Sequence, residues 1–279
     1  MYSVKKEVGD TELFILKDGE TEFGKETFIV NDSNEIQRLL KLNDRQAIET
    51  NFNAFLVRTG ERNILIDAGA GNLFGPAAGN LKYALNEVGV KNDEITDVIA
   101  THLHPDHIGG LISEDGNPVF ENAGLILTQK EHDFWTNVGN FKNNLEDLKL
   151  PLQVLSKYTD KLTLISNDAD IGSGLSAIDL PGHTAGHIGV LISSGNQQFA
   201  IAGDIIHAQY LQINNPDIGV VFDQDPDLAK KSRKKMLDIL ADEEIAFSGG
   251  HILSPAIGFI KRRDNGYVWV QGEPNWLKK

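Results

Sequence analysis

Three histidines and one aspartate lie within six residues of one another in the segment 101–110, which reads Thr-His-Leu-His-Pro-Asp-His-Ile-Gly-Gly. Neutral imidazole and carboxylate are the usual protein ligands of zinc and similar divalent ions. A polar loop that is rich in histidine by chance is the plain alternative, but the whole chain has only eight histidines. The segment therefore predicts a metal site with His102, His104, Asp106 and His107 as ligands.

Three further side chains stand in similar surroundings later in the chain. His183 follows Pro-Gly, Asp204 follows Ala-Gly and His251 follows Gly-Gly, each just after an apolar run of strand length. Glycine lets the backbone turn sharply and approach a metal closely. Each of these residues alone is more often a capping or otherwise satisfied polar group. Together with the first segment, they form a coherent set of ligands.

The seven candidate ligands exceed the four that a tetrahedral zinc ion needs. Five histidines and two aspartates suit two divalent ions, with one carboxylate shared between them. Such a pair lowers the pKa of a bound water, orients the resulting hydroxide and stabilises charge on the attacked group. The predicted chemistry is therefore hydrolysis by a hydroxide that bridges two metals and attacks a carbonyl carbon or a phosphorus centre.

The elements that must position these residues alternate between strands and helices. Short runs that are rich in Ile, Leu, Val or Phe and bounded by Gly, Asp or Asn predict strands. The ligand groups follow the C-terminal ends of such runs, where α/β proteins build their sites. The predicted strands are Glu12–Leu16, Phe52–Val57, Asn63–Ile66, Asp97–Ala100, Leu125–Thr128, Leu162–Ile165, Leu175–Leu180, Gly189–Ile192, Phe199–Ala202 and Ile245–Ser248.

Apolar residues at helical spacing predict helices over Ala78–Glu87, Lys130–Asn137, Leu145–Lys157 and Leu228–Leu240. The last of these has an apolar face, with Lys and Arg residues opposite that are expected to face solvent. The mixture of strands and helices predicts a layered α/β protein in which helices cover sheets. No linker is long enough to divide the chain into independent domains.

The composition narrows the classes of function. The chain has 279 residues and a formal net charge of −14, which disfavours binding to nucleic acid or to an anionic membrane. It has no cysteine, so thiolate ligands, disulfides and a cysteine nucleophile are excluded. No apolar leader or membrane-spanning run is visible, so a cytoplasmic location is the expectation, and an exported precursor with a missing leader stays open.

The motif His-x-His-x-Asp-His, followed by Gly-His, Gly-Asp and a late histidine, resembles the metallo-β-lactamase superfamily from roughly Phe52 to Tyr267. The resemblance implies a four-layer αβ/βα sandwich, with two mixed sheets flanked by helices, as a single domain over residues 1–279. It also implies that Asp204 bridges two zinc ions. By the same resemblance, the first ion is held by His102, His104 and His183, and the second by Asp106, His107 and His251.

Several shorter segments are similar to the methyl parathion hydrolase group, some members of which are quorum-quenching N-acyl-homoserine lactonases. Phe74 and Trp135 match aromatic residues that line the substrate pocket in that group, although core packing explains them equally well. His207 is a further pocket candidate, and a satisfied histidine without a catalytic role is the alternative. The segment Gly139–Leu150, near the expected pocket mouth, does not align with the group. The segments that match are 53–60, 66–71, 73–76, 129–135 and 254–258.

This resemblance implies hydrolysis of a lactone or another ester-like bond, of the N-acyl-homoserine lactone type, with phosphotriesterase activity as a side reaction. Asp106 is expected to pass a proton to the leaving group. Phosphotriester hydrolysis as the main activity and a glyoxalase II-like thioesterase are the alternatives. A β-lactamase is disfavoured because those enzymes lack a bridging aspartate at the position of Asp204, and a di-iron redox protein because those relatives usually carry Glu in place of His104. A nuclease is disfavoured because it would need a track of basic residues to bind phosphate, and the chain has a net charge of −14.

Residues near the ligand motifs also have expected roles. Asp67 resembles the buried aspartate of the family and is expected either to orient a ligand histidine or to form a turn before glycine. His187 is expected to be structural or to support a ligand from behind, and His132 to face solvent or to pack on its helix. The resemblance also implies a homodimer, with the tail Gly266–Val270 and the N-terminal segment as candidate interface strands, unless they simply pack at the edges of sheets.

Overall fold

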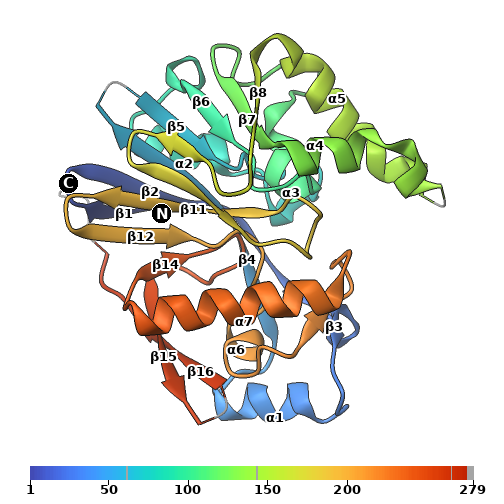
Figure 1. The fold of residues 1–279 in the computed structure, drawn as a ribbon, viewed down its shortest axis with the longest axis vertical. Helices are drawn as coiled ribbons and strands as arrows, with labels where there is room; N and C mark the ends of the chain where they lie inside the picture. Colours follow the sequence, from blue (N-terminus) through green and yellow to red (C-terminus); the bar gives the residue numbers. More distant parts are fainter. Residues whose placement is uncertain (61, 143, 265, 275–279) are drawn as a thin grey trace.

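Two seven-stranded sheets face each other in the computed structural model, which describes residues 1–60, 62–142, 144–264 and 266–274 (Figure 1). The first sheet is built entirely from the N-terminal part of the chain. Its strands, in spatial order, are β1 (Ser3–Val8), β2 (Thr11–Phe23), β4 (Ile48–Thr59), β5 (Arg62–Ile66), β6 (Asp97–Ile99), β7 (Gly124–Thr128) and β8 (Leu162–Ile165).

The second sheet is built entirely from the C-terminal part of the chain. A small two-stranded sheet pairs β3 (Phe28–Ile29) with β13 (Gly219–Val220) and links the two parts. The strands of the second sheet, in spatial order, are β16 (Gly266–Gln271), β15 (Gly258–Arg263), β14 (Ala246–Ser248), β12 (Gln197–Ile201), β11 (Ile188–Ser194), β10 (Leu175–Asp179) and β9 (Asp170–Gly172).

Helices flank both sheets and give the expected αβ/βα sandwich. The helices next to the first sheet include α2, α4 and α5, whereas α7 runs along the second sheet with α6 and α1 near its end (Figure 1). In the described part of the chain, no helix is long and apolar enough to cross a membrane. The helices are α1 (Glu35–Leu42), α2 (Leu81–Glu87), α3 (Pro105–Ile108), α4 (Gln129–Thr136), α5 (Lys149–Tyr158), α6 (Gln209–Gln212) and α7 (Pro226–Asp242).

The sequence of β4 shows how the layers form. Side chains alternate between the two faces of a strand. Phe55 and Val57 therefore point into the apolar cluster between the sheets, and Ala54 and Leu56 point into the cluster under the helices of the first sheet. All four side chains are fully buried. A strand that is covered on both faces reads as a continuous apolar run, and this is why β4 is recognisable in the sequence.

The predicted strands all overlap strands of the structure, but their ends and their number differ. β2 extends to Phe23 through the polar run Asp-Gly-Glu-Thr-Glu, which carries no strand signal, and a register shift occurs between Lys17 and Gly19. The tail and the N-terminal segment, which were expected to form interface strands or to pack at the edges of sheets, form the edge strands β16 and β1. The short strands β3, β9 and β13 and the largely polar strand β15 were not predicted, because such strands do not show an apolar run.

Two predicted helices begin later than expected. Gly79 has a φ of +92°, which no right-handed helix contains, so α2 starts at Leu81 and not at Ala78. The segment from Leu145 forms a 3₁₀ turn, and α5 proper begins at Lys149, so that Pro151 falls in its first turn, where the missing N–H costs nothing.

The helix α7 corrects a third expectation, that its Lys and Arg residues form a solvent-exposed face. Arg233 is only 1% exposed and lies among the buried residues of the helix. Its guanidinium group donates to the carbonyl oxygens of Ile205 and Ile218, which satisfies a charge in the interior. Arg233 was assigned to the exposed face because its side chain is charged, but it lies within the buried stripe of the helix, and the acceptors that satisfy it come from distant loops.

Strand direction explains where the site forms. β5 to β8 run parallel, and β10, β12 and β14 share one direction because β11 is antiparallel to both of its neighbours and β12 is parallel to β14. The loops that follow β6, β10, β12 and β14 carry the predicted ligands. Parallel strands of each sheet thus deliver these loops to one edge of the sandwich.

Candidate metal centre

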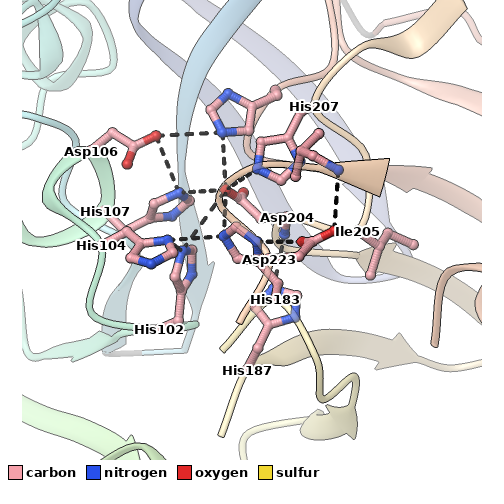
Figure 2. A network of polar contacts seen from close by, with 12 residues as sticks. His102, His104, Asp106, His107, His183, His187, Asp204, Ile205, His207 and Asp223 are labelled. Carbon is pink, nitrogen blue, oxygen red and sulfur yellow. Dashed lines mark hydrogen bonds and ion pairs between the residues drawn. The ribbon is translucent and has the colours of Figure 1, made fainter. Parts of the chain in front are cut away.

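Three histidine rings from two separate loops converge on one point, which we call the three-histidine site: His102, His104 and His183. The Nδ1 atom of His104 lies 3.0 Å from Nε2 of His102 and 2.9 Å from Nε2 of His183. The first two residues follow β6, and the third follows β10. Figure 2 shows these rings turned toward one another. This is the set of ligands that the family resemblance assigned to the first metal.

A second set, which we call the carboxylate site, consists of Asp106, His107, Asp204 and His251. The Oδ2 atom of Asp204 lies 3.2 Å from Nε2 of His107 and 2.9 Å from Nε2 of His251. The Oδ2 atom of Asp106 is 3.4 Å from the same His251 nitrogen.

Asp204 lies between the two sites (Figure 2). Its Oδ2 atom is 3.8 Å from Nε2 of His102 and 3.6 Å from Nε2 of His183, in addition to its contacts within the carboxylate site. Its other oxygen, Oδ1, is buried and has no hydrogen-bond partner among the described residues. A carboxylate in this position can contribute to both sites at once, as the bridging role requires.

Acceptors behind the rings decide which nitrogen of each histidine faces the centre. Nδ1 of His107 contacts Asp67 at 2.8 Å, and Nδ1 of His251 contacts the carbonyl oxygen of Asn51 at 2.9 Å. A neutral ring that donates through Nδ1 presents a bare lone pair on Nε2. Metal-ligating histidines are held in this way by outer carboxylates and carbonyls.

Asp223 plays the same part behind His183, whose Nδ1 lies 2.9 Å from Asp223 Oδ1 (Figure 2). Behind His102, the hydroxyl of Thr101 donates to Asp67 and lies 3.1 Å from Nδ1 of His102. When they are neutral, the rings of His102, His107, His183 and His251 therefore present an unprotonated Nε2 to the centre. So many lone pairs facing one another are stable only around cations, and the donor set fits two divalent metal ions.

The electrostatics differ between the two sites. Burial, together with the neighbouring imidazoles, holds the pKa of each ring in the three-histidine site well below its usual range. In the carboxylate site, burial works in the same direction, but the carboxylates of Asp204 and Asp106 outweigh it and raise the pKa of His107 and His251. The rings of the three-histidine site are therefore neutral and ready to bind a metal ion. In the carboxylate site, the negative charge of the aspartates balances either the protons on the histidines or a bound cation.

Asp67 fulfils both of its expected roles. Its backbone lies in the left-handed region, with φ of +58°, directly before two small residues. Its carboxylate accepts from the N–H and hydroxyl of Thr101 and contacts His107. A residue in a sparsely populated backbone conformation that also orients a ligand is typical of a functional loop.

The other histidines separate into three roles. His187 is fully buried, and its Nδ1 lies 2.8 Å from the Leu180 carbonyl oxygen while its Nε2 accepts from the backbone N–H of Asp204, so it fixes the bridging residue through the backbone. His207 stacks on His251, and its Nδ1 is buried without a partner among the described residues. His132 lies on α4, outside the cluster, beside the exposed Asp133.

Sequence reasoning missed Asp223 and Glu131. Asp223 lies in the segment Phe-Asp-Gln-Asp-Pro, where it looks like any loop aspartate before a helix. Glu131 lies on α4 in a segment whose likeness to a known family was noted, yet its carboxylate is fully buried. Neither has a signal in the sequence, because the groups that they contact are far away along the chain.

A pocket of about 920 Å³ opens above the metal centre. The three predicted pocket residues all line it: Phe74 is 40% exposed, and Trp135 and His207 are buried. Residues of the unaligned segment also contribute to its wall. Aromatic side chains dominate the lining, and the charged residues are all acidic. The aromatic residues are Phe23, Phe52, Phe74, Phe134, Trp135, Phe141 and Phe222, and the acidic ones are Glu22, Asp106, Asp147 and Asp204.

Comparison with solved structures places this arrangement among known metal enzymes. The dizinc quorum-quenching lactonase AidC, solved with the product N-hexanoyl-L-homoserine, is 32% identical to this chain, with a TM-score of 0.89 over 98% of each chain. The hydrolase AbOPH of the beta lactamase superfamily is 26% identical, with a TM-score of 0.92 over 99% of this chain and 98% of the other.

Comparison with curated sequences points the same way. An N-acyl homoserine lactonase of Bacillus cereus is 26% identical over 168 residues, which cover 60% of this chain and 60% of the relative. The chain thus spans less than two thirds of the length of that relative. The profile of the Metallo-beta-lactamase superfamily matches residues 49–251, a range that contains every ligand of both sites. This chain therefore belongs to the metallo-β-lactamase superfamily and is a metal-dependent hydrolase with a centre for two divalent metal ions.

Proposed function

We propose that the enzyme hydrolyses a lactone or a similar ester, of the N-acyl-homoserine lactone type, through a water activated between two metal ions. The observation that carries this proposal is the pocket above the metal centre, which combines aromatic walls with acidic charges. Among the described residues that line it, none is Lys or Arg. Beyond the metal centre, such a wall favours a neutral substrate with an apolar chain, because its charged residues, Glu22 and Asp147, offer no partner to an anion.

The similarity to lactonases supports the same reading. A lactone with an acyl chain is neutral and has an apolar tail, which matches the aromatic wall. The alternative of a thioesterase that acts on glutathione conjugates is weaker, because those substrates carry several carboxylates and the described pocket wall beyond the metal centre has no Lys or Arg to pair with them.

When bound, the two divalent ions supply an activated water and polarise the acceptor oxygen of the substrate. The side chains of the protein hold and orient this centre. Asp204 holds the two sites together, and Asp67 and Asp223 keep the ligand rings in the required tautomer. The side chain of Asp106 is 15% exposed, against 2% for that of Asp204, so it is placed to carry a proton from the centre to the leaving group at the pocket side.

We assign His207 to the substrate side of this centre. Its Nε2 lies 3.4 Å from Asp204 Oδ2, and its Nδ1 has no partner among the described residues. The ring lines the pocket beside Phe222, at a centroid distance of 6.0 Å. A buried nitrogen that lacks a partner can bond a polar atom of the substrate at no cost to another contact.

The direct test is turnover of a long-chain N-acyl-homoserine lactone by zinc-loaded protein, with chelator-stripped protein as the control. A metal-dependent kcat/KM of ~10⁴ M⁻¹s⁻¹ or more would support the lactonase, because that value is the low end for real substrates. Replacement of His104 or Asp204 by Ala should abolish turnover and lower the metal content. The matched control is His132→Ala, which lies outside the cluster and should keep both.

Phosphotriesters are the second candidate class, because they are also neutral and fit an aromatic pocket. If lactone turnover is feeble while a phosphotriester reaches the same kcat/KM threshold, the main activity is phosphotriesterase. If both fail but zinc binds fully, the ester class proposed here is wrong and the metal-dependent hydrolase assignment stands.

We also propose that residues 1–279 act as one domain and that the enzyme is a homodimer. The apolar cluster between the two sheets contains residues from both parts of the chain, which supports the single domain. The tail Gly266–Val270 and the N-terminal segment lie on β16 and β1, at the outer edges of the two sheets, where a partner strand could pair. Analytical ultracentrifugation checks the dimer, and a monomer at micromolar concentration would contradict it.

A further inference from the structure

The carboxylate of Glu131 is fully buried on α4 and accepts four hydrogen bonds. Its Oε1 atom accepts from the backbone N–H of Leu103 at 3.0 Å and from the indole N–H of Trp135 at 2.7 Å. Its Oε2 atom accepts from the hydroxyl of Thr184 at 2.7 Å and from the backbone N–H of Gly186 at 2.9 Å. A buried carboxylate is costly unless it is satisfied in this way.

The donors belong to the two loops that form the three-histidine site. Leu103 stands between His102 and His104, and Thr184 follows His183 directly. One side chain thus ties together the backbone of both loops, although they lie about eighty residues apart in the chain. Among the described residues, no other carboxylate accepts hydrogen bonds from both of these loops.

A second, independent contact holds the same elements together. A Cβ atom on Gly186 would lie 2.2 Å from the backbone nitrogen of Glu131, so only glycine allows the loop after β10 to pack this closely on α4. The hydroxyl of Thr128, which caps α4, also donates to the Gly186 carbonyl oxygen. The start of α4 and the loop are therefore in direct backbone contact.

The fourth donor connects this junction to the pocket wall. The indole of Trp135 meets the ring of His104 edge-on, with centroids 5.8 Å apart, and stacks on Phe141. Trp135 therefore contacts a metal ligand on one side and the pocket lining on the other, and Glu131 holds its N–H.

We propose that Glu131 is a positioning residue for the three-histidine site, which it assembles from two loops and couples to the Trp135 wall of the pocket. It touches neither metal nor substrate and acts through the backbone on either side of the ligands. The inference rests on the metal centre and not on which ester is hydrolysed, so its test can fail without affecting the proposed lactonase activity.

The test is Glu131→Gln in the zinc-loaded enzyme, with zinc release measured by chelator competition. Glutamine cannot accept at both ends, so in either orientation its amide group faces a backbone N–H. We expect one of the two zinc ions to bind about 10–100-fold more weakly, as after loss of other outer partners of metal ligands, and the second to stay close to wild type. Cobalt substitution should show the loss in the visible spectrum of one site.

Two comparisons separate positioning from general support of the fold. Asp18→Asn removes another fully buried carboxylate, which accepts from the backbone N–H groups of Ala70 and Leu81, and should lower thermal stability with little effect on zinc at the three-histidine site. In the His104→Ala background, where that site is already lost, Glu131→Gln should not weaken the remaining zinc further.

Thr184→Val, which deletes a single donor, provides a milder variant if Glu131→Gln does not fold. It should weaken one zinc ion several-fold and leave the other unchanged. The proposal is overturned if either folded variant holds both zinc ions with wild-type affinity. It is also overturned if both ions weaken equally and in step with a loss of thermal stability like that of Asp18→Asn.

Discussion

At the scale of single residues, the centre is organised by the groups behind the ligands. His183 offers Nε2 to a metal because Asp223 holds its Nδ1 at 2.9 Å. Asp223 in turn lies 3.8 Å from the guanidinium of Arg233, a residue that was expected at the protein surface. A chain of three residues thus runs from the helix α7 to the metal centre.

Removal of Asp223 should therefore weaken metal binding at the three-histidine site. For Asp223→Ala we expect the affinity for one zinc ion to fall about 10–100-fold, because the ring of His183 loses its fixed orientation. Chelator competition measures this. Asp217→Ala, which removes an exposed aspartate paired with Lys234, is the control and should not change zinc affinity. Equal zinc affinity in the two variants would contradict the role of Asp223.

A second prediction at the scale of residues concerns the contribution of Arg233 to stability. Burial lowers the pKa of Arg233 to about 10, and its charge is compensated by Asp223 and by carbonyl oxygens. Arg233→Met would leave these acceptors buried and unpaired, which costs about 3–5 kcal/mol when one partner of a buried ion pair is removed. Urea denaturation measures the free energy of unfolding. The exposed Lys231→Met on the same helix should change it by less than about 0.5 kcal/mol.

At the scale of elements, the packing of α7 on the loop after β10 determines where His183 lies. Gly182 precedes His183 and has a φ of +124°. A Cβ atom at this position would lie 2.1 Å from the backbone nitrogen of Ala229 in α7. The helix and the ligand loop are therefore in contact through backbone atoms.

Gly182→Ala should force α7 and this loop apart. We expect a loss of about 1–3 kcal/mol in the free energy of unfolding from overpacking, in addition to the cost of the left-handed backbone, together with weaker zinc binding. Gly195→Ala is a control with a φ of +60° and open space around the added carbon, so it carries the backbone cost without the clash. If both variants lose the same stability and zinc affinity, the close contact has no role.

The elements also show what the sequence could and could not predict. β4, β6 and β12 were predictable because buried strands read as apolar runs, and the loops after β6 and β12 carry ligands. Asp223 and Glu131 were not, because their roles depend on loops that meet only when the two sheets face each other. Arg233 was placed wrongly for the same reason: its acceptors lie in the loops around Ile205 and Ile218.

At the scale of the whole molecule, the metal centre makes stability depend on pH. In metal-free protein, the carboxylates raise the pKa of His107 and His251 above the ordinary 6.5, so the folded state holds protons that the unfolded state releases. This contribution is fully present below pH 6.5 and is lost as the pH rises through the raised pKa values. The three-histidine site acts in the opposite direction, because its lowered pKa values make the unfolded state bind more protons below pH 6.5.

We therefore expect the melting temperature of metal-free protein to be highest near pH 6.5 and to fall as the pH moves away from it in either direction. Zinc replaces the protons in the carboxylate site, so the difference in melting temperature between zinc-loaded and stripped protein should grow as the pH rises above 6.5. Calorimetry of both forms measures it. His251→Gln should flatten the alkaline fall of the stripped protein, and an unchanged fall in that variant would contradict the explanation.

The division of the sheets along the chain has a consequence for assembly. Residues up to Asp168 contain the whole first sheet with four ligands, and the rest contain the whole second sheet with the other three. If the chain were cut at the exposed turn between β8 and β9, neither fragment would have a complete ligand set for either site. The metal ions would then connect the two fragments, because each ion takes ligands from both. The zinc concentration would determine whether separately produced fragments reassemble into one enzyme.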